Sequence, residues 1–84
     1  MTAFEQVVNI GPVLAGDLRA IGIPDLEALR AVGAFEACRR LEAAGREDCT
    51  HSYLALEGAL AGVRWMELPP ERRSELASRW RGRA

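Results

Sequence analysis

Few side chains in this sequence could carry out acid–base or metal chemistry. His51 is the only histidine, and Cys49, two residues before it, could supply the other half of a metal-binding pair. Cys38 is the only other thiol, so no set of ligands with zinc spacing exists. No serine–histidine–acid or cysteine–histidine arrangement can be completed, because the adjacent Asp48 lies in a short polar segment that offers no oxyanion pocket. The sequence therefore predicts neither an enzyme nor a bound metal or cofactor.

A different chemistry, the binding of a phosphate group, is possible in the stretch 8–23, VNIGPVLAGDLRAIGI. It has the layout of a helix-hairpin-helix, in which a short helix leads through a glycine-containing turn into a second helix. Gly11 allows a tight turn, and the free N–H groups at the start of the helix that Pro12 opens can hold a phosphate. Such turns grip the DNA backbone without reading its bases. We therefore take Asn9, Gly11 and Pro12 as candidate nucleic-acid contacts.

The residues after this turn favour a simpler alternative. Helix-hairpin-helix DNA binders often place lysine or arginine directly after the Gly-Pro pair, where the side chain meets a phosphate. Here that position is Val13, followed by Leu14 and Ala15. The sequence leaves two interpretations open, a phosphate-binding turn and a plain turn between two helices.

Positive charge is concentrated towards the C-terminal end of the chain, and all eleven basic residues are arginine. Residues 1–63 carry five arginines and nine acidic residues, a net charge of −4. Residues 64–84 carry six arginines and three glutamates, a net charge of +3. With a total of −1, the chain lacks the general positive field on which non-specific nucleic-acid binding depends. Any phosphate-binding surface must therefore be local.

The last predicted helix places an aromatic residue, Trp80, among arginines. These arginines are Arg72, Arg73, Arg79, Arg81 and Arg83. Such a helix could face phosphate or an acidic patch on another protein, and we take Arg72, Arg73 and Arg79 as further candidate nucleic-acid contacts. The alternative is a solvated face on which arginine stems cover apolar surface. We expect Trp65 in the core and Trp80 at its edge.

Glycine and proline divide the chain into short segments, each with a helical spacing of apolar residues. Six helices are predicted, over residues 3–8, about 12–21, 25–32, about 34–44, about 51–61 and from 69 to the C-terminal tail. We expect Gly22 to end the second helix in a left-handed conformation, with Ile23 folding back onto it, and Asp25 to cap the third. No segment shows a sustained two-residue alternation, so no sheet is predicted.

The helix over 51–61 is apolar nearly all round, which is typical of the central helix of a small bundle. Gly58 and Gly62, four residues apart, weaken this helix and so indicate a closely packed neighbouring helix. Glu57 must be exposed or paired, because burying a lone carboxylate is costly. We expect it to form an interhelical ion pair or a cap. The arginines that could pair with it are Arg19, Arg30 and Arg64.

The composition fits a single folded domain over residues 1–84. The sequence is 49% hydrophobic and 27% charged, which is ordinary for a globular protein, and the chain is too short for two cores. We expect the tail over about 81–84 to fray. The sequence shows no secretory signal and no membrane-spanning stretch, and its two cysteines fit a reduced protein, so we expect a cytoplasmic location.

Several separated motifs, in the right order, resemble the C-terminal domain of TfoX-type regulators of DNA transformation (competence). The segments that carry the resemblance are NIGP at 9–12, LAGDLRAIGIPDLEALRAVGA at 14–34 and SYLALEGALAGVRWMELP at 52–69. The resemblance covers roughly residues 8–78 and implies an all-α fold, a compact bundle of five to six short helices containing a helix-hairpin-helix-like (SAM-like) unit. In the fuller bacterial regulators this domain follows an N-terminal domain, so we expect a stand-alone version here.

Two functions of different classes follow from these observations. The resemblance implies a non-enzymatic regulatory module in competence, and the acidic first 63 residues and the missing base after Gly11-Pro12 favour action through protein–protein contacts. The partner would be a regulatory protein or a second copy of the chain, with no membrane and no small-molecule substrate expected. The alternative is weak, sequence-independent binding of DNA through the Gly11-Pro12 turn and the arginine-rich C-terminal helix.

Overall fold

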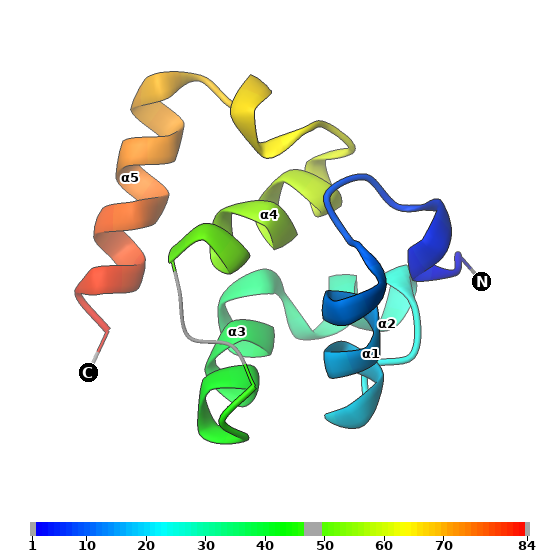
Figure 1. The fold of residues 1–84 in the computed structure, drawn as a ribbon. Helices are drawn as coiled ribbons and strands as arrows, with labels where there is room; N and C mark the ends of the chain where they lie inside the picture. The colour runs from blue at the N-terminus through cyan, green and yellow to red at the C-terminus, as the bar shows by residue number, and fades with distance from the viewer. Residues whose placement is uncertain (1, 47–49, 84) are drawn as a thin grey trace.

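The computed structural model describes residues 2–46 and 50–83, except for the side chain of Thr50. These residues form five α-helices and two single-turn 3-10 helices and contain no strand (Figure 1), so the predicted all-α class is confirmed. In chain order the elements are η1 (Phe4–Gln6), α1 (Pro12–Ala20), α2 (Leu26–Val32), α3 (Ala34–Ala43), α4 (Thr50–Ala61), η2 (Trp65–Glu67) and α5 (Pro70–Arg81). None of the helices in this part of the chain is long and apolar enough to cross a lipid bilayer.

The ends of the helices follow local signals in the sequence. Gly22 adopts a left-handed conformation with φ of +88°, and the N–H of Ile23 donates back to the carbonyl of Leu18 at 2.9 Å. This hydrogen bond closes the last turn of α1, and the side chain of Ile23 is buried. At the start of α2 the side chain of Asp25 accepts a hydrogen bond from the N–H of Ala28 at 2.9 Å. Both predicted helix ends are confirmed.

The first helix is much shorter than predicted. η1 spans only three residues, and Val7 after it has extended backbone angles of φ −107° and ψ 129°. Asn9 follows with a positive φ of 72°, which no other non-glycine residue in the described ranges has. A left-handed residue at this point ends any helix before α1. The helix-hairpin-helix-like unit predicted around residues 8–23 is therefore not confirmed.

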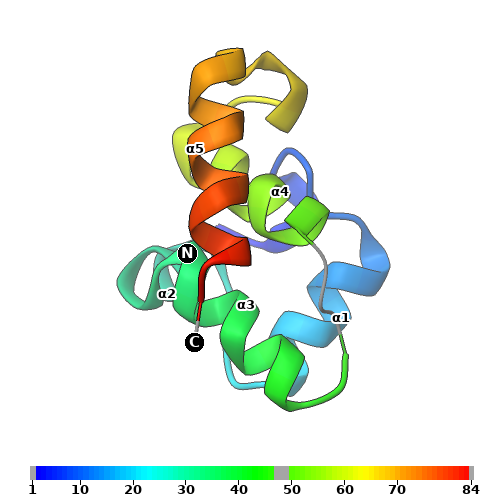
Figure 2. The same ribbon diagram turned by 90° about the vertical axis from the view of Figure 1, so that its left-hand side faces the viewer.

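α4 is the central element of the bundle, as its apolar composition predicts. Its buried apolar side chains are Tyr53, Leu54, Ala55, Leu56 and Ala59. It packs against α2, α3, α5 and η2. Two perpendicular views show α4 between α5 on one side and the N-terminal segment on the other (Figures 1 and 2). Both ends of the chain are thus packed around this one helix.

Three aromatic rings join α3, α4 and α5. Phe35 meets Tyr53 and Trp80 edge-on, with ring centroids 5.6 and 5.5 Å apart, and Tyr53 stacks on Trp80 at 5.5 Å. Trp80 is therefore a core residue, only 2% exposed, whereas Trp65 is half-buried. The prediction that placed Trp65 inside and Trp80 at the edge is wrong, because the rings that enclose Trp80 come from two other helices.

The C-terminal end of the chain is fastened to α3. α5 ends at Arg81, and beyond it Arg83 donates to the carbonyl of Trp80 at 2.7 Å and forms an ion pair with Glu42. The guanidinium of Arg83 also lies 4.0 Å from the centroid of the Trp80 ring. Arg83 belongs to the tail that is expected to fray, and these contacts hold it against the bundle.

Candidate interaction surfaces

Asn9 lies where the N-terminal segment meets α4 and the chain that follows it. Its Nδ2 atom donates hydrogen bonds to the carbonyl of Ala55 at 3.2 Å and to that of Val63 at 2.9 Å. Its Oδ1 atom accepts a hydrogen bond from the N–H of Trp65 at 3.2 Å. We call Asn9 and these three backbone groups the Asn9 junction. Because both ends of the amide bond to the protein itself, the side chain of Asn9 positions the chain.

Gly58 makes this close approach possible. A Cβ atom at position 58 would lie 2.7 Å from Asn9 Nδ2 and 2.9 Å from the carbonyl oxygen of Val63. A larger residue at this place would push the junction apart, because such contacts are shorter than packed atoms tolerate. Gly58 therefore has the close neighbour that the sequence predicts, but this neighbour is the Asn9 junction and not a second helix.

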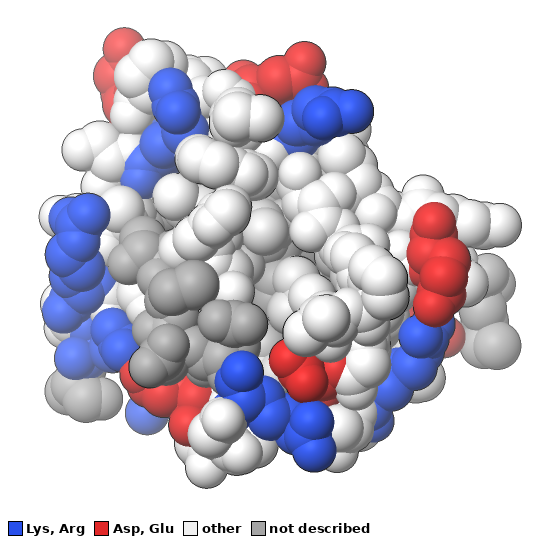
Figure 3. Space-filling view, viewed as in Figure 1, with Lys and Arg blue, Asp and Glu red and all other residues white. Residues whose placement is uncertain are grey.

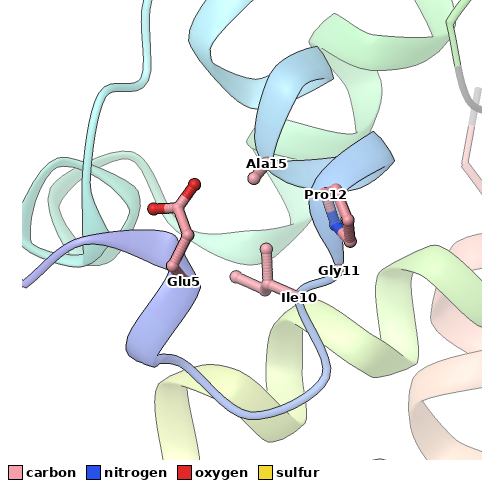
Figure 4. A pocket seen from close by; sticks show the side chains of 5 residues that line it. All are labelled: Glu5, Ile10, Gly11, Pro12 and Ala15. Carbon is pink, nitrogen blue, oxygen red and sulfur yellow. The ribbon is translucent and has the colours of Figure 1, made fainter.

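The Gly11–Pro12 turn lies on the surface beside η1. Gly11 precedes α1 with φ −87° and ψ −179°, an extended conformation, and Pro12 occupies the first helical position. Both residues are exposed, and Val13 after them is 75% exposed. Gly11 and Pro12, with Glu5, Ile10 and Ala15, line a pocket of about 170 Å³ (Figure 4). Small-molecule sites usually have roughly 300–1,000 Å³, so this pocket is small for an organic ligand.

Glu5 beside this pocket is paired with Arg19, and the pair has no net positive charge that would attract a phosphate. Arg19 of α1 donates two hydrogen bonds to the Glu5 carboxylate, at 2.7 and 2.8 Å, and these lower the pKa of Glu5 to about 2. The carboxylate is therefore charged at neutral pH, and it lies on the η1 side of the pocket (Figure 4). None of the described residues that line the pocket is basic. The turn thus offers backbone N–H groups to an anion but no positive side chain.

The three candidate arginines of α5 have three different environments. Arg72 is exposed and pairs with Glu75, one turn further along the helix. Arg73 is half-buried, and its Nε atom is buried with no hydrogen-bond partner in the described part of the chain. Arg79 is exposed, and its guanidinium lies 4.8 Å from the centroid of the Phe35 ring on α3. Of the three, Arg73 and Arg79 form no ion pair within the described ranges.

The structure does not bring the two predicted groups of nucleic-acid contacts together. The segment 9–12 lies beside η1 and α1, whereas the arginines of α5 lie on the other side of α4 (Figures 1 and 2). The candidate residues therefore form two separate surfaces and not one groove for nucleic acid.

The candidate metal ligands do not form a site in the described part of the chain. His51 is exposed, and its ring lies 4.7 Å from the ring of Trp65. Cys38 is buried, whereas Cys49 and Asp48 lie outside the described residues. Within the ranges 2–46 and 50–83, no group of three or more His, Cys, Asp or Glu side chains is placed to hold a metal ion.

The ion pair predicted for Glu57 is not formed among the described residues, so this prediction is wrong. Arg19 is engaged by Glu5, and Arg30 donates to a backbone carbonyl of α4 at 3.4 Å. Glu57 is half-buried, one turn along α4 from Tyr53. Burial of the Tyr53 hydroxyl raises its pKa, and the neighbouring carboxylate of Glu57 raises it further.

Comparison with known proteins shows the family of the chain. The family model described as the TfoX C-terminal domain matches residues 2–80. The chain belongs to the TfoX C-terminal domain family. No curated protein matches it at a significant level.

Two crystal structures from Listeria monocytogenes share the fold of this TfoX C-terminal domain. One is a triclinic form of an uncharacterised protein, with 37% sequence identity and a TM-score of 0.80, covering 87% of this chain and 83% of that chain. The other is a tetragonal form of a protein of unknown function, with 35% identity and a TM-score of 0.85, covering 93% of this chain and 95% of that chain.

Two of the segments that carry the family resemblance meet at the Asn9 junction of this TfoX C-terminal domain. Asn9 comes from NIGP, and Gly58 and Trp65 come from SYLALEGALAGVRWMELP. The residues that these segments contribute to the junction therefore have a structural role. The surfaces of α3 and α5 lie largely outside these segments.

Arg39 of α3 is a residue that the sequence analysis does not single out. It stands at i, i+4, i+7 spacing with Phe35 and Glu42, so the three share one face of α3. This spacing was available in the sequence, but only the fold shows that Arg79 and Arg83 contact Phe35 and Glu42, the two residues between which Arg39 stands on this face.

Proposed function

We propose that this TfoX C-terminal domain is a non-enzymatic regulatory module that acts through protein–protein contacts in the control of competence for DNA transformation. Membership of the family supports the regulatory role. The two similar structures are of proteins described as uncharacterised or of unknown function, so they support the fold and add no activity.

The proposed mode of action rests on the position of the arginines that form no ion pair among the described residues. Ion pairs within the described residues engage five of the eleven arginines. Of the six others, four lie on α3 and α5, namely Arg39, Arg73, Arg79 and Arg81. A chain with a net charge of −1 thus presents a locally basic surface, which favours a partner that carries acidic groups.

Weak binding of DNA is the second candidate, because the arginines of α5 lie at the surface. Two features of the structure count against it. The Gly11–Pro12 turn lies on the other side of α4 from these arginines, and the Glu5–Arg19 pair beside the turn adds no net positive charge. The four arginines of α3 and α5 outside ion pairs among the described residues would neutralise few phosphates, so binding of a duplex through them alone would be weak and easily lost as salt is raised.

Disruption of the gene in its own host tests the regulatory role. We expect the frequency of transformation by added DNA to change, and a wild-type copy of the gene to restore it. An unchanged frequency under conditions that induce competence would contradict the proposal.

Sedimentation equilibrium of the purified domain distinguishes the two kinds of protein partner. A concentration-dependent increase in mass at micromolar concentrations would identify a second copy of the chain as the partner. A monomer over that range would favour a different protein.

A further inference from the structure

The C-terminal end of α5 reaches one face of α3 through side-chain contacts (Figure 2). Phe35, Arg39 and Glu42 share that face. Arg79 contacts Phe35 at one end of it, and Arg83 pairs with Glu42 at the other. Arg39 therefore stands between these two contacts. We call the surface formed by Phe35, Arg39, Glu42, Arg79 and Arg83 the α3–α5 seam.

Aromatic rings hold two of the arginines of the seam in place. The guanidinium of Arg79 lies 4.8 Å from the centroid of Phe35, and that of Arg83 lies 4.0 Å from the centroid of Trp80. Arg83 also donates to the carbonyl of Trp80 at 2.7 Å. Side chains that are already held in one place lose less conformational entropy when a ligand binds.

The α3–α5 seam carries more positive than negative charge. It holds three arginines and one carboxylate, that of Glu42, whose pKa is lowered chiefly by the hydrogen bond from Arg83 and also by the charges of Arg83 and Arg39. Arg39 and Arg79 are exposed and form no ion pair within the described ranges. Figure 3 shows arginine side chains gathered along the edge of the molecule that α5 forms. Within the part of the chain that the structure describes, these two guanidinium groups thus lie outside ion pairs and can meet an incoming anion.

We propose that the α3–α5 seam is the docking site for an acidic segment of a protein partner, with Arg39 and Arg79 each binding a carboxylate. This inference rests on the proposed function and names its surface and the chemistry of its partner. A planar guanidinium matches a carboxylate through two parallel hydrogen bonds. An open hollow of about 260 Å³, lined by Glu36, Arg39, Arg40 and Ala43, gives a neighbouring side chain of the bound segment room beside the seam.

The dimensions of the seam favour a peptide over a nucleic acid. The step from Phe35 to Glu42 covers about 10 Å of helix, which matches about three residues of an extended peptide. Two carboxylates of α5, those of Glu75 and Glu71, lie about one and two helical turns before Arg79. A phosphate backbone that continued past the seam would meet these like charges, whereas a short acidic segment ends before them.

An NMR titration with a defined acidic peptide tests the proposal. The isotope-labelled domain is titrated at low salt with a capped peptide that carries three consecutive glutamates, and with a glutamine peptide of equal length as the uncharged control. We expect the Nε–Hε signals of Arg39 and Arg79 to shift saturably with the glutamate peptide only. Peptide concentrations up to about 1 mM cover weak binding.

Two double variants separate local contacts from overall charge. Arg39→Gln with Arg79→Gln removes both proposed contacts, whereas Arg30→Gln with Arg64→Gln removes the same charge outside the seam. We expect the first pair to weaken binding of the peptide at least about tenfold and the second pair by less than about threefold. Amide spectra that match the wild type establish that both variants are folded.

Three other outcomes of these titrations would overturn the proposal. Equal weakening by the two double variants would show attraction by overall charge and no docking at the seam. Absence of shifts up to the highest peptide concentration would exclude the acidic segment, and tighter saturable binding of duplex DNA would assign the seam to nucleic acid.

Rescue in the host distinguishes failure of the seam from failure of the proposed function. If Arg39→Gln with Arg79→Gln restores transformation as fully as the wild type, the seam is excluded and the regulatory role stands. An unchanged frequency after disruption of the gene contradicts the regulatory role itself, whatever the peptide titration shows.

Discussion

Asn9 is the single residue on which the arrangement of the N-terminal segment depends most. Its positive φ ends η1 and turns the chain into α1. Its amide ties this turn to α4 and to the segment before η2. Because Gly58 leaves room for the amide, the two residues act as one structural unit.

The replacement Asn9→Ala is expected to lower the free energy of unfolding by about 3 kcal/mol. It removes the hydrogen bonds to the two carbonyls and the N–H of the Asn9 junction, and it puts an alanine at a positive φ. Asn9→Gly isolates the loss of the hydrogen bonds, because glycine adopts this φ without strain. Urea denaturation measures both variants, and wild-type stability of Asn9→Ala would show that the junction is unimportant.

Gly58→Ala and Gly16→Ala form a matched pair with opposite expected signs. A Cβ atom at Gly16 of α1 would meet nothing within 4 Å, so this change should stabilise the domain by about 0.5–1 kcal/mol. At Gly58 the Cβ atom would lie 2.7 Å from Asn9 Nδ2, and we expect a loss of about 1–3 kcal/mol. Thermal unfolding of the two variants checks this, and a gain in stability for Gly58→Ala would contradict it.

The Glu5–Arg19 ion pair should make stability depend on pH in the acid range. Hydrogen bonds from Arg19 lower the pKa of Glu5 from 4.5 to about 2 in the folded protein. The contribution of the pair is therefore fully present above the unfolded-state pKa and is lost as the pH falls through about 2. The melting temperatures of the wild type and Glu5→Gln should differ near neutral pH and converge near pH 2. A difference that stays constant over this range would disprove the assignment.

At the scale of elements, local hydrogen bonds could be predicted and long-range ones could not. The left-handed stop at Gly22 and the cap by Asp25 join residues within one or two helical turns, and the sequence shows both. The end of the first helix depends on Asn9, whose partners lie 46 to 56 positions away. For the same reason the sequence indicates Arg79 as a candidate contact but not Arg39. Arg39 belongs to the same surface only because side chains of α5 contact α3.

The C-terminal end of α5 depends on Arg83 for its attachment to α3. Arg83→Ala removes the ion pair with Glu42 and the cover over the Trp80 ring. We expect amide hydrogen exchange in the last turn of α5 to become about fivefold faster. Arg81→Ala is the matched control, because Arg81 is exposed and forms no ion pair in the described part of the chain. Equal acceleration in the two variants would argue against this attachment.

At the scale of the whole molecule, α4 separates two surfaces with different properties. On one side lie the Asn9 junction and the Gly11–Pro12 turn, where Glu5 is paired with Arg19. On the other side lies α5, which holds three of the six arginines outside ion pairs among the described residues, namely Arg73, Arg79 and Arg81. Although the net charge of the chain is −1, positive charge is concentrated on one side of α4. This local charge favours a partner with acidic groups over a continuous phosphate backbone.

Fluorescence anisotropy of labelled duplex and single-stranded DNA tests most directly the claim that the domain acts through contacts with protein. The domain is titrated to roughly 100 µM at about 50 mM salt, which reaches the weak end of non-specific affinities. We predict no saturable binding of either DNA. Binding that disappears at higher salt and in the variant Arg72→Glu with Arg73→Glu would contradict the account and assign the arginines of α5 to phosphate.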